Sequence, residues 1–214
     1  VHELAASLER AVPLLLVRCP SARHTARLLS GRVIMSGGPF LITERLILRP
    51  PSAEDFEGWA AFCADPVTMT HLGGPKGRGE SWRMLCTMVG AWQVRGYAMF
   101  SMILRDSGQW IGRTGPWMPE GWPGTEVGWG VAQEFAGQGY ALEAATASID
   151  YAFDVLGWDN VIHTIDPANT ASVALAERLG SYDQGETRLP DPFQDIPVRA
   201  WGQSKAEWKA RTGE

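Results

Sequence analysis

Several classes of protein are disfavoured by what this chain lacks. Its three cysteines, Cys19, Cys63 and Cys86, form neither a metal-spaced pair nor an even set for disulfides. This usage favours a reducing compartment, and we predict a cytoplasmic protein. The four histidines show no clustered pattern, so we predict no metal site. No lysine-rich run accompanies the net charge of −5, which argues against a nucleic-acid partner.

The sequence also lacks a convincing membrane segment. The short apolar run Val12–Val17 is too brief to span a bilayer and is interrupted by Pro13. A secretory signal is disfavoured because Glu3 and Glu9 precede that run. We therefore expect no membrane partner.

Residues 1–36 differ in charge from the rest of the chain. No acidic residue occurs between Arg10 and Thr43, whereas arginines are scattered through that stretch. We predict that residues 1–36 are an N-terminal extension outside the main domain, with Met35 as an alternative start. An arginine-rich targeting peptide is the other interpretation of this composition.

Length and composition agree with one soluble domain. The chain has 214 residues, of which 45% are apolar, enough for a single substantial core. Patterns typical of strands and helices alternate along it, which predicts an α/β or α+β layered fold. Leu41, Leu46 and Leu48 mark a first strand. Further strands are expected at Tyr97–Leu104, Trp110–Trp117, Glu126–Ala132, Val161–Ile165, Asp183–Arg188 and Val198–Trp201.

Helices are expected between these strands. Ser52 is a candidate cap for the first, and Ser204 with Glu207 forms a capping box for a terminal one. Others are predicted at Glu80–Val94, Gly139–Leu156 and Asn169–Leu179. The second helix carries apolar residues at helical spacing, namely Trp82, Leu85, Val89 and Trp92. The Gly139–Leu156 helix has a stripe expected to be buried, made of Ala145, Ile149, Ala152, Phe153 and Leu156.

The most informative stretch runs from Glu126 to Ala145 and is typical of a strand, a glycine turn and a helix. Gly137 and Gly139 have no Cβ, so the backbone can curl and aim successive N–H groups at one anion. The helix that follows adds the positive end of its dipole. The segment is therefore a candidate phosphate cradle.

Two nucleotide-binding motifs do not fit this turn. A dinucleotide fingerprint needs a third glycine where this chain has Leu142. A triphosphate loop ends in Gly-Lys-Ser/Thr, whereas Lys76 is followed by glycine. A nicotinamide-dependent oxidoreductase is therefore disfavoured, and a plain helix start rich in small residues is the structural alternative for the turn.

Several motifs in order resemble the GNAT acyltransferase superfamily, and specifically its ribosomal-protein N-terminal acetyltransferase branch. The resemblance covers Leu41 to Trp208. It is carried by Leu41–Pro50, Trp110–Gly112, Glu120–Gly124, the Glu126–Ala145 stretch, Asp166–Ser172 and Ala176–Gly180. Ala136 is a departure, because many relatives have Gln or Arg there. The resemblance implies that residues 37–214 form the acetyltransferase domain.

The family fold implied is a twisted mixed sheet, flanked by helices, in which two adjacent parallel strands splay apart to admit acetyl-CoA. In this chain those strands would be Glu126–Ala132 and Val161–Ile165. The pantetheine arm would pair with backbone groups of the first strand, much as an added strand does. The cofactor-binding residues implied are Trp129, Gly130, Val131, Gly137, Gln138, Gly139, Tyr140, Ala141, Asn169 and Ser172.

The reaction implied is direct acetyl transfer from acetyl-CoA to a primary amine, with no metal. Glu126 is the candidate base for the amine, and its alternative is a surface carboxylate. By resemblance, the N–H of Val131 would stabilise the oxyanion and Ser172 would donate to the leaving thiolate. Tyr182 is a rival donor. Asn169 and Ser172 also fit a helix cap, and both roles are compatible.

The acceptor is less constrained by the sequence. A protein N-terminus or a small molecule would fit, and a homodimer is a further expectation. Trp117, Trp122 and Trp129 are candidates to wall the acceptor pocket by holding a cation, with simple packing as the alternative. Acceptor choice is also expected to involve the helices within Ser52–Val94 and the loop Leu189–Pro197, where Asp191 and Asp195 could attract a positive charge. The alternative function is a non-catalytic acyl-CoA-binding or sensing domain.

Overall fold

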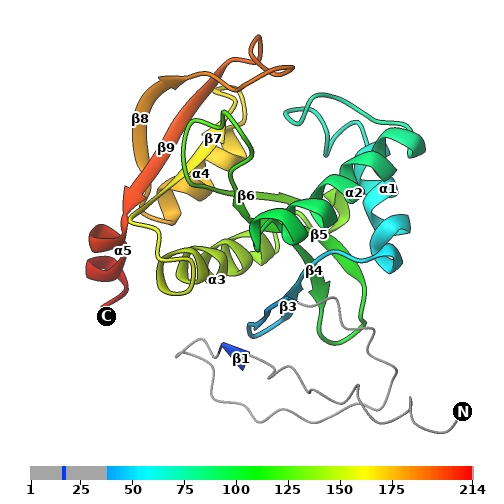
Figure 1. Cartoon of the computed structure of the whole chain (residues 1–214), viewed down its shortest axis with the longest axis horizontal. Coiled ribbons are helices and arrows are strands. Elements are labelled where there is room, and N and C mark those ends of the chain that lie inside the picture. The colour runs from blue at the N-terminus through cyan, green and yellow to red at the C-terminus, as the bar shows by residue number, and fades with distance from the viewer. Residues whose placement is uncertain (1–15, 18–37, 214) are drawn as a thin grey trace, which may run out of the picture.

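The computed structural model describes residues 16–17 and 38–213 (Figure 1). The prediction for residues 1–36 lies almost wholly outside these residues. Its described part is β1 (Leu16–Val17), which pairs in parallel with β2 (Phe40–Ile42) at the edge of the sheet. The boundary at residue 36 stays a prediction.

Within the described residues, nine strands form one mixed sheet in the order β1-β2-β3-β4-β5-β6-β7-β9-β8. Two neighbouring pairs are parallel, β1 with β2 and β6 with β7, and the others are antiparallel. This confirms the predicted mixed sheet. The remaining strands are β3 (Leu46–Arg49), β4 (Phe100–Leu104), β5 (Trp110–Trp117), β6 (Glu126–Val131), β7 (Asn160–Ile165), β8 (Tyr182–Thr187) and β9 (Val198–Ser204).

Helices cover both faces of the sheet (Figure 1). Adjacent residues of β5 show which helix lies on which side, because side chains alternate along a strand. Arg113 lies over the ring of Trp59 in α1, whereas Thr114 Oγ1 lies 3.5 Å from Ser148 Oγ in α3. The helices are η1 (Ala53–Asp55), α1 (Phe56–Ala64), α2 (Arg78–Arg95), η2 (Gln133–Phe135), α3 (Tyr140–Asp154), α4 (Thr170–Arg178) and α5 (Lys205–Thr212).

The predicted first strand is wrong as a single element, because it is the hairpin of β2 and β3. Leu41 and Leu46 are five residues apart, so one straight strand would place them on opposite faces. The turn lets both be buried, and the Thr43 N–H donates to Leu46 O at 3.0 Å across it. Leu41 then pairs with Leu48.

The residues that helix α2 buries differ in part from the apolar stripe that helical spacing predicts. Leu85 and Trp92 are buried, but Trp82 and Val89 are 46% and 37% exposed. Trp82 instead packs edge-on against Phe56, with ring centroids 5.0 Å apart. The buried positions are Ser81, Leu85, Met88 and Trp92.

Helix α3 lies between the two hydrophobic clusters formed by the described residues. Four residues of its predicted stripe are fully buried in the cluster shared with α5, and Leu156 is partly buried just beyond the helix end. Ala144, Ala147 and Tyr151 belong to the other cluster, with residues of α1, α2 and β4. A helix that is apolar on two sides is fixed in position, and this fixes the glycine turn at its N-terminus.

A buried ion pair joins the start of α1 to the sheet. Asp55 accepts hydrogen bonds from Arg49 at 2.6 and 2.9 Å, from Ser101 Oγ at 2.7 Å and from the Ser52 N–H at 2.9 Å. Its side chain is only 2% exposed. Arg49 belongs to β3 and Ser101 to β4, so this carboxylate holds both strands to the helix.

The Asp55→Ala variant is expected to lose about 3–5 kcal/mol of unfolding free energy, because it leaves the Arg49 guanidinium without its carboxylate. Chemical denaturation measures the loss. The exposed neighbour Glu54 supplies the control, and Glu54→Ala should stay within about 0.5 kcal/mol of wild type. A loss for Asp55→Ala as small as that of the control would contradict the anchoring role.

Candidate active site

The parallel pairing between β6 and β7 stops after one step. The strands are in register at Glu126 and Ile162 alone, where the Ile162 N–H donates to Thr125 O at 2.9 Å. In a continued parallel ladder, the next inward N–H on β7 is that of Thr164, and its acceptor would be Val127 O. Neither group makes that bond.

Two side chains take the place of the missing ladder. Thr164 donates its N–H to Glu126 Oε1 at 3.3 Å and its hydroxyl to Glu126 Oε2 at 2.9 Å. The His163 Nδ1–H donates to Val127 O at 2.7 Å. The strands therefore diverge beyond Glu126, which confirms the predicted splayed pair and explains it physically.

Beyond the divergence, β6 presents free backbone groups to the gap. The Ala132 N–H donates to Ile111 O at 2.9 Å, whereas Thr125 O and Val127 O point toward β7. Because backbone groups alternate along a strand, those of Trp129 and Val131 face the gap. The groups of Gly130 face β5, and a Cβ at Gly130 would lie 2.9 Å from Phe62.

The glycine turn has the conformation that its residues allow. Gly137 and Gly139 have φ values of 74° and 85°, a region that favours glycine. Gly139 caps α3, and the first helical bond runs from the Glu143 N–H to Gly139 O. The N–H groups of Gly137, Gln138 and Gly139 have no acceptor among the described residues. These free donors at a helix N-terminus suit an anion such as a pyrophosphate.

Arg45, in the β2–β3 turn, holds this cradle and was missed in the sequence. Its Nη1 donates to Gln138 O at 2.9 Å, and its Nε donates to Glu143 Oε2 at 2.7 Å. Thr43 Oγ1 also donates to Glu143, at 2.6 Å. Arg45 Nη2 lies 3.3 Å from where a Cβ of Gly139 would be. The Arg45 guanidinium therefore places a positive charge beside the free N–H groups, whereas the side chain of Ala136 provides no charge there. Arg45 belongs to the motif Leu41–Pro50, but its partners Gln138 and Glu143 lie about a hundred residues further along the chain.

Glu126 is buried, so its interpretation as a surface carboxylate is wrong. The residue is 6% exposed and lies at the divergence of the strands. Burial raises the pKa of Glu126 to about 7, although hydrogen bonds from Trp122 Nε1 and Thr164 and the charge of Arg113 oppose this shift. A carboxyl group with that pKa can take up a proton near neutral pH.

Asn169 caps α4 as its residue type predicts. Its side-chain oxygen accepts from the Ser172 N–H at 3.1 Å. Trp129 Nε1 donates to Ser172 Oγ at 3.3 Å, so the serine hydroxyl is tied to β6 across the gap. Tyr182 is 52% exposed on β8, at the outer edge of the sheet beyond β9. Ser181 is the neighbour that points inward.

A buried hydrogen-bond chain fixes His163. Gln203 Nε2 donates to Ser181 Oγ at 3.0 Å, and Ser181 Oγ lies 3.0 Å from His163 Nε2. Val127 O can only accept, so Nδ1 carries the proton and Nε2 accepts from the serine. Burial lowers the pKa of His163 to about 4, which keeps the ring neutral. Both ring nitrogens of His163 are hydrogen-bonded, so it is a satisfied packing residue.

The three tryptophans before the cradle do not form one wall. Trp117 lies opposite Glu126 in the register of β5 and β6, and its ring centroid is 6.3 Å from that of Trp122. Trp129 lies on the other face, where its ring contacts His163 at 4.6 Å. Only the first two therefore lie on the α1–α2 side of the sheet with Glu126.

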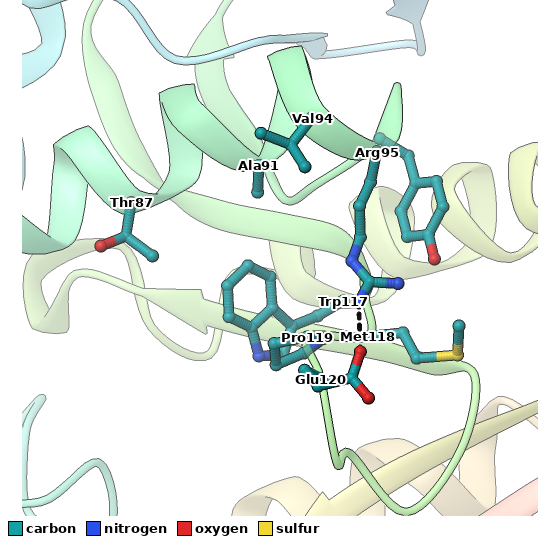
Figure 2. Close-up of a pocket in the computed structure, with 9 residues that line it drawn as sticks. Thr87, Ala91, Val94, Arg95, Trp117, Met118, Pro119 and Glu120 are labelled. Atoms are coloured by element: carbon teal, nitrogen blue, oxygen red, sulfur yellow. Dashed lines mark hydrogen bonds and ion pairs between the residues drawn. The ribbon is translucent and has the colours of Figure 1, made fainter.

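Trp117 also lines a cavity of about 250 Å³ between α2 and the β5–β6 loop (Figure 2). An ion pair of 3.5 Å between Arg95 and Glu120 lies at its edge.

Elsewhere on the surface, Asp191 and Asp195 are exposed in the loop between β8 and β9. Their predicted contribution to acceptor choice stays a prediction.

The described residues show neither a metal-binding cluster nor a membrane-spanning helix. No group of three histidine, cysteine, aspartate or glutamate side chains there is arranged to hold a metal ion. None of the helices in residues 38–213 is both long and apolar enough to cross a membrane.

The geometry has counterparts in known proteins. The family model described as the acetyltransferase (GNAT) domain matches residues 45–181. The chain belongs to the GNAT acetyltransferase family. It is 32% identical over 152 residues to the uncharacterized protein YkkB of Bacillus subtilis, covering 66% of this chain and 84% of that one. It is 29% identical over 151 residues to the uncharacterized N-acetyltransferase p20 of Bacillus licheniformis, covering 69% and 85%.

Solved structures of GNAT acetyltransferases share the fold. An acetyltransferase from Agrobacterium tumefaciens superimposes with a TM-score of 0.68 at 30% identity, covering 85% of this chain and all of that one. The ribosomal-protein-S5-alanine acetyltransferase from Vibrio fischeri gives a TM-score of 0.60 at 18% identity over 79% and 98% of the two chains. The second likeness is one of fold. Together these findings confirm the GNAT resemblance and identify the chain as an N-acetyltransferase.

The raised pKa of Glu126 gives a testable dependence of stability on pH. A carboxyl group whose folded pKa lies above its ordinary 4.5 stabilises the protein below that pH, and the contribution is lost as pH rises to about 7. Glu126→Gln removes this titration. Its unfolding free energy relative to wild type should therefore increase by up to about 3 kcal/mol over this range and then level off.

Denaturation curves across this pH range provide the measurement, with Glu134→Gln as the matched control on the exposed η2. A stability difference between Glu126→Gln and wild type that stays constant with pH would show that Glu126 titrates normally.

Proposed function

We propose that this acetyltransferase uses acetyl-CoA as its donor and a primary amine as its acceptor. The observation that carries the proposal is the divergence of β6 and β7, which leads to a cradle of free N–H groups at Gly137–Gly139. Bound acetyl-CoA would supply the activated acetyl group as a thioester. The residues present fit this molecule, because one segment offers amide partners for a pantetheine arm and the next offers donors for a pyrophosphate.

The backbone roles follow the position of each group. Trp129 and Val131 hold the pantetheine arm in the gap, with Gly130 between them. The N–H of Val131 serves as the oxyanion donor in the transition state. Gly137 to Ala141 hold the pyrophosphate, with Gln138 and Tyr140 contributing their N–H groups.

Glu126 serves as the general base, directly or through a water molecule. An amine that arrives as an ammonium ion must lose a proton before it attacks the thioester carbonyl. A carboxylate with a pKa of about 7 takes that proton effectively near neutral pH. Trp122 and Thr164 hold its oxygens in place.

Ser172 serves as the donor to the leaving thiolate. Its oxygen already accepts from Trp129 Nε1, so its own proton is available for another acceptor. Asn169 holds the first turn of α4 and is the candidate contact for the pantetheine arm. The exposed Tyr182 is less favoured for the donor role.

The acceptor class includes protein N-termini and small amines. The Vibrio fischeri neighbour, a ribosomal-protein-S5-alanine acetyltransferase, supports testing N-terminal peptides alongside small molecules. Ala136 favours the alternative of a binding module that releases no thiol. The guanidinium of Arg45 beside Gly139 weakens that argument, because it supplies positive charge at the same turn.

Thiol release from acetyl-CoA, measured across amines and N-terminal peptides, tests the proposal. We expect acceptor-dependent release whose kcat/KM rises with pH and levels off above about pH 7. Glu126→Gln should lower the rate by roughly 10²–10⁴-fold and remove that pH dependence. Glu134→Gln is again the control. Binding of acetyl-CoA without thiol release in the presence of any acceptor would favour the non-catalytic binding domain. The absence of acetyl-CoA binding would contradict both proposed functions.

Arg45→Met is expected to weaken the binding of acetyl-CoA. Losing the guanidinium frees the Gln138 carbonyl and removes positive charge from the cradle, so KM for acetyl-CoA should rise by about 10-fold or more, in line with the loss of a charged hydrogen bond. Steady-state kinetics give this value, and the KM for the acceptor should barely change. Arg105→Met makes a useful comparison, because Arg105 binds the carbonyls of Thr43 and Glu44 in the same turn. Equal effects of the two variants would show that Arg45 acts only by shaping the turn.

A further inference from the structure

Arg113 is a partly buried cation that forms no ion pair with the residues that the structure describes. It lies on β5, and its guanidinium carbon is 5.5 Å from the ring centroid of Trp59 and 5.9 Å from that of Phe62. Burial lowers its pKa. Within residues 38–213 its guanidinium makes no hydrogen bond or ion pair of the kinds that hold Arg45 and Arg49. Desolvating a guanidinium without a partner is costly.

Cys63 and Glu126 lie close enough to influence the pKa of Arg113, but neither forms a hydrogen bond or ion pair with its guanidinium. Burial raises the pKa of the Cys63 thiol, which therefore stays neutral beside Arg113. In the same layer, Trp59 Nε1 is a buried donor that also has no acceptor among the described residues. Two unpaired donors on one side of the sheet are unusual, because buried polar groups are normally satisfied.

The register places Arg113 on the same face as the candidate base. Arg113 lies opposite Gly130, and Trp117 lies opposite Glu126. Side chains two and four residues apart share a face, so Arg113 and Glu126 both point to the α1–α2 side. Gly130 and Glu126 are four residues apart, which is about 13 Å along a strand. The two charges also influence each other, since Arg113 lowers the pKa of Glu126.

We propose that Arg113 binds a carboxylate on the amine acceptor, so that the enzyme prefers acceptors carrying a negative group several bonds from the reacting amine. The inference rests on the proposed function of the site. The planar guanidinium presents a fork of N–H donors that matches the two oxygens of a carboxylate. The amine then lies toward Glu126 and the carboxylate toward Arg113.

Stacking on Trp59 and Phe62 alone is the competing explanation. Cation–π contact stabilises a guanidinium through its face, but it leaves the in-plane N–H donors unused. A purely structural Arg113 would affect folding and would not distinguish a carboxylate from its uncharged amide. The choice of acceptor therefore separates the two explanations.

The test compares matched acceptors by thiol release. One arm uses ω-amino acids of increasing length, each with its amide. The other uses N-terminal peptides with Asp or Asn at the second position, so the arms distinguish a free acid from an acidic side chain. The variants are Arg113→Met and Arg113→Lys, with the exposed Arg83→Met as control. The readout is the ratio of kcat/KM for acid and amide, which does not depend on how much of each preparation is folded.

For wild type and Arg83→Met we expect at least one acid to exceed its amide by roughly 10- to 100-fold, the value of a charged hydrogen-bonded pair. Arg113→Met should bring that ratio close to one, mainly through KM, and Arg113→Lys should keep part of it. A wild-type ratio near one for every pair, or a ratio unchanged in Arg113→Met, would overturn the proposal even if transfer to amines occurs.

Failure of the proposed function is recognised separately. If no amine releases thiol, calorimetry with an acetylated ω-amino acid and its amide tests the subsite without turnover. Tighter binding of the acid, lost in Arg113→Met, would support the anion subsite alone. Equal binding of acid and amide would reject it.

Discussion

The site depends on the place where β6 and β7 stop pairing. Had the ladder continued, the Thr164 N–H would bond to Val127 O and the sheet would be closed. The side chains of Glu126 and His163 take those two bonds instead. The strands diverge as a result, and the gap exposes the backbone groups of Trp129 and Val131. The opening for a donor is therefore made by side-chain hydrogen bonds within the sheet.

Two glutamates near this gap show how environment assigns different roles to one residue type. Burial would raise the pKa of Glu143, but hydrogen bonds from Thr43 and Arg45 outweigh it, and the pKa falls below its ordinary value. Glu143 therefore stays charged and holds the β2–β3 turn against α3. Burial dominates at Glu126, which forms no ion pair with the described residues and is only influenced by the charge of Arg113, and its pKa rises to about 7. The first carboxylate suits a structural clamp and the second suits proton transfer.

Local signals in the sequence predicted most of the strands, the main helices and the glycine turn before α3, because alternation, helical spacing and glycine act over a few residues. Arg45 could not be assigned a role, since its partner Glu143 is about a hundred residues away. The face on which Trp129 lies depends on the register of β5 and β6, which spacing alone does not give. The hairpin at Thr43 differs from the single predicted strand, because Leu41 and Leu46 lie an odd number of residues apart and can both be buried only if the chain turns between them. The residue-level roles in acetyl transfer stay predictions.

The central claim is that acetyl-CoA occupies the gap between β6 and β7 and binds its free backbone groups. Residue-resolved amide hydrogen exchange tests it most directly. Acetyl-CoA should slow exchange at Trp129 and Val131, whose N–H groups face the gap, and leave Gly128 and Gly130, which face β5, nearly unchanged. Equal slowing at all four residues, or slowing at Gly128 and Gly130 alone, would contradict the account.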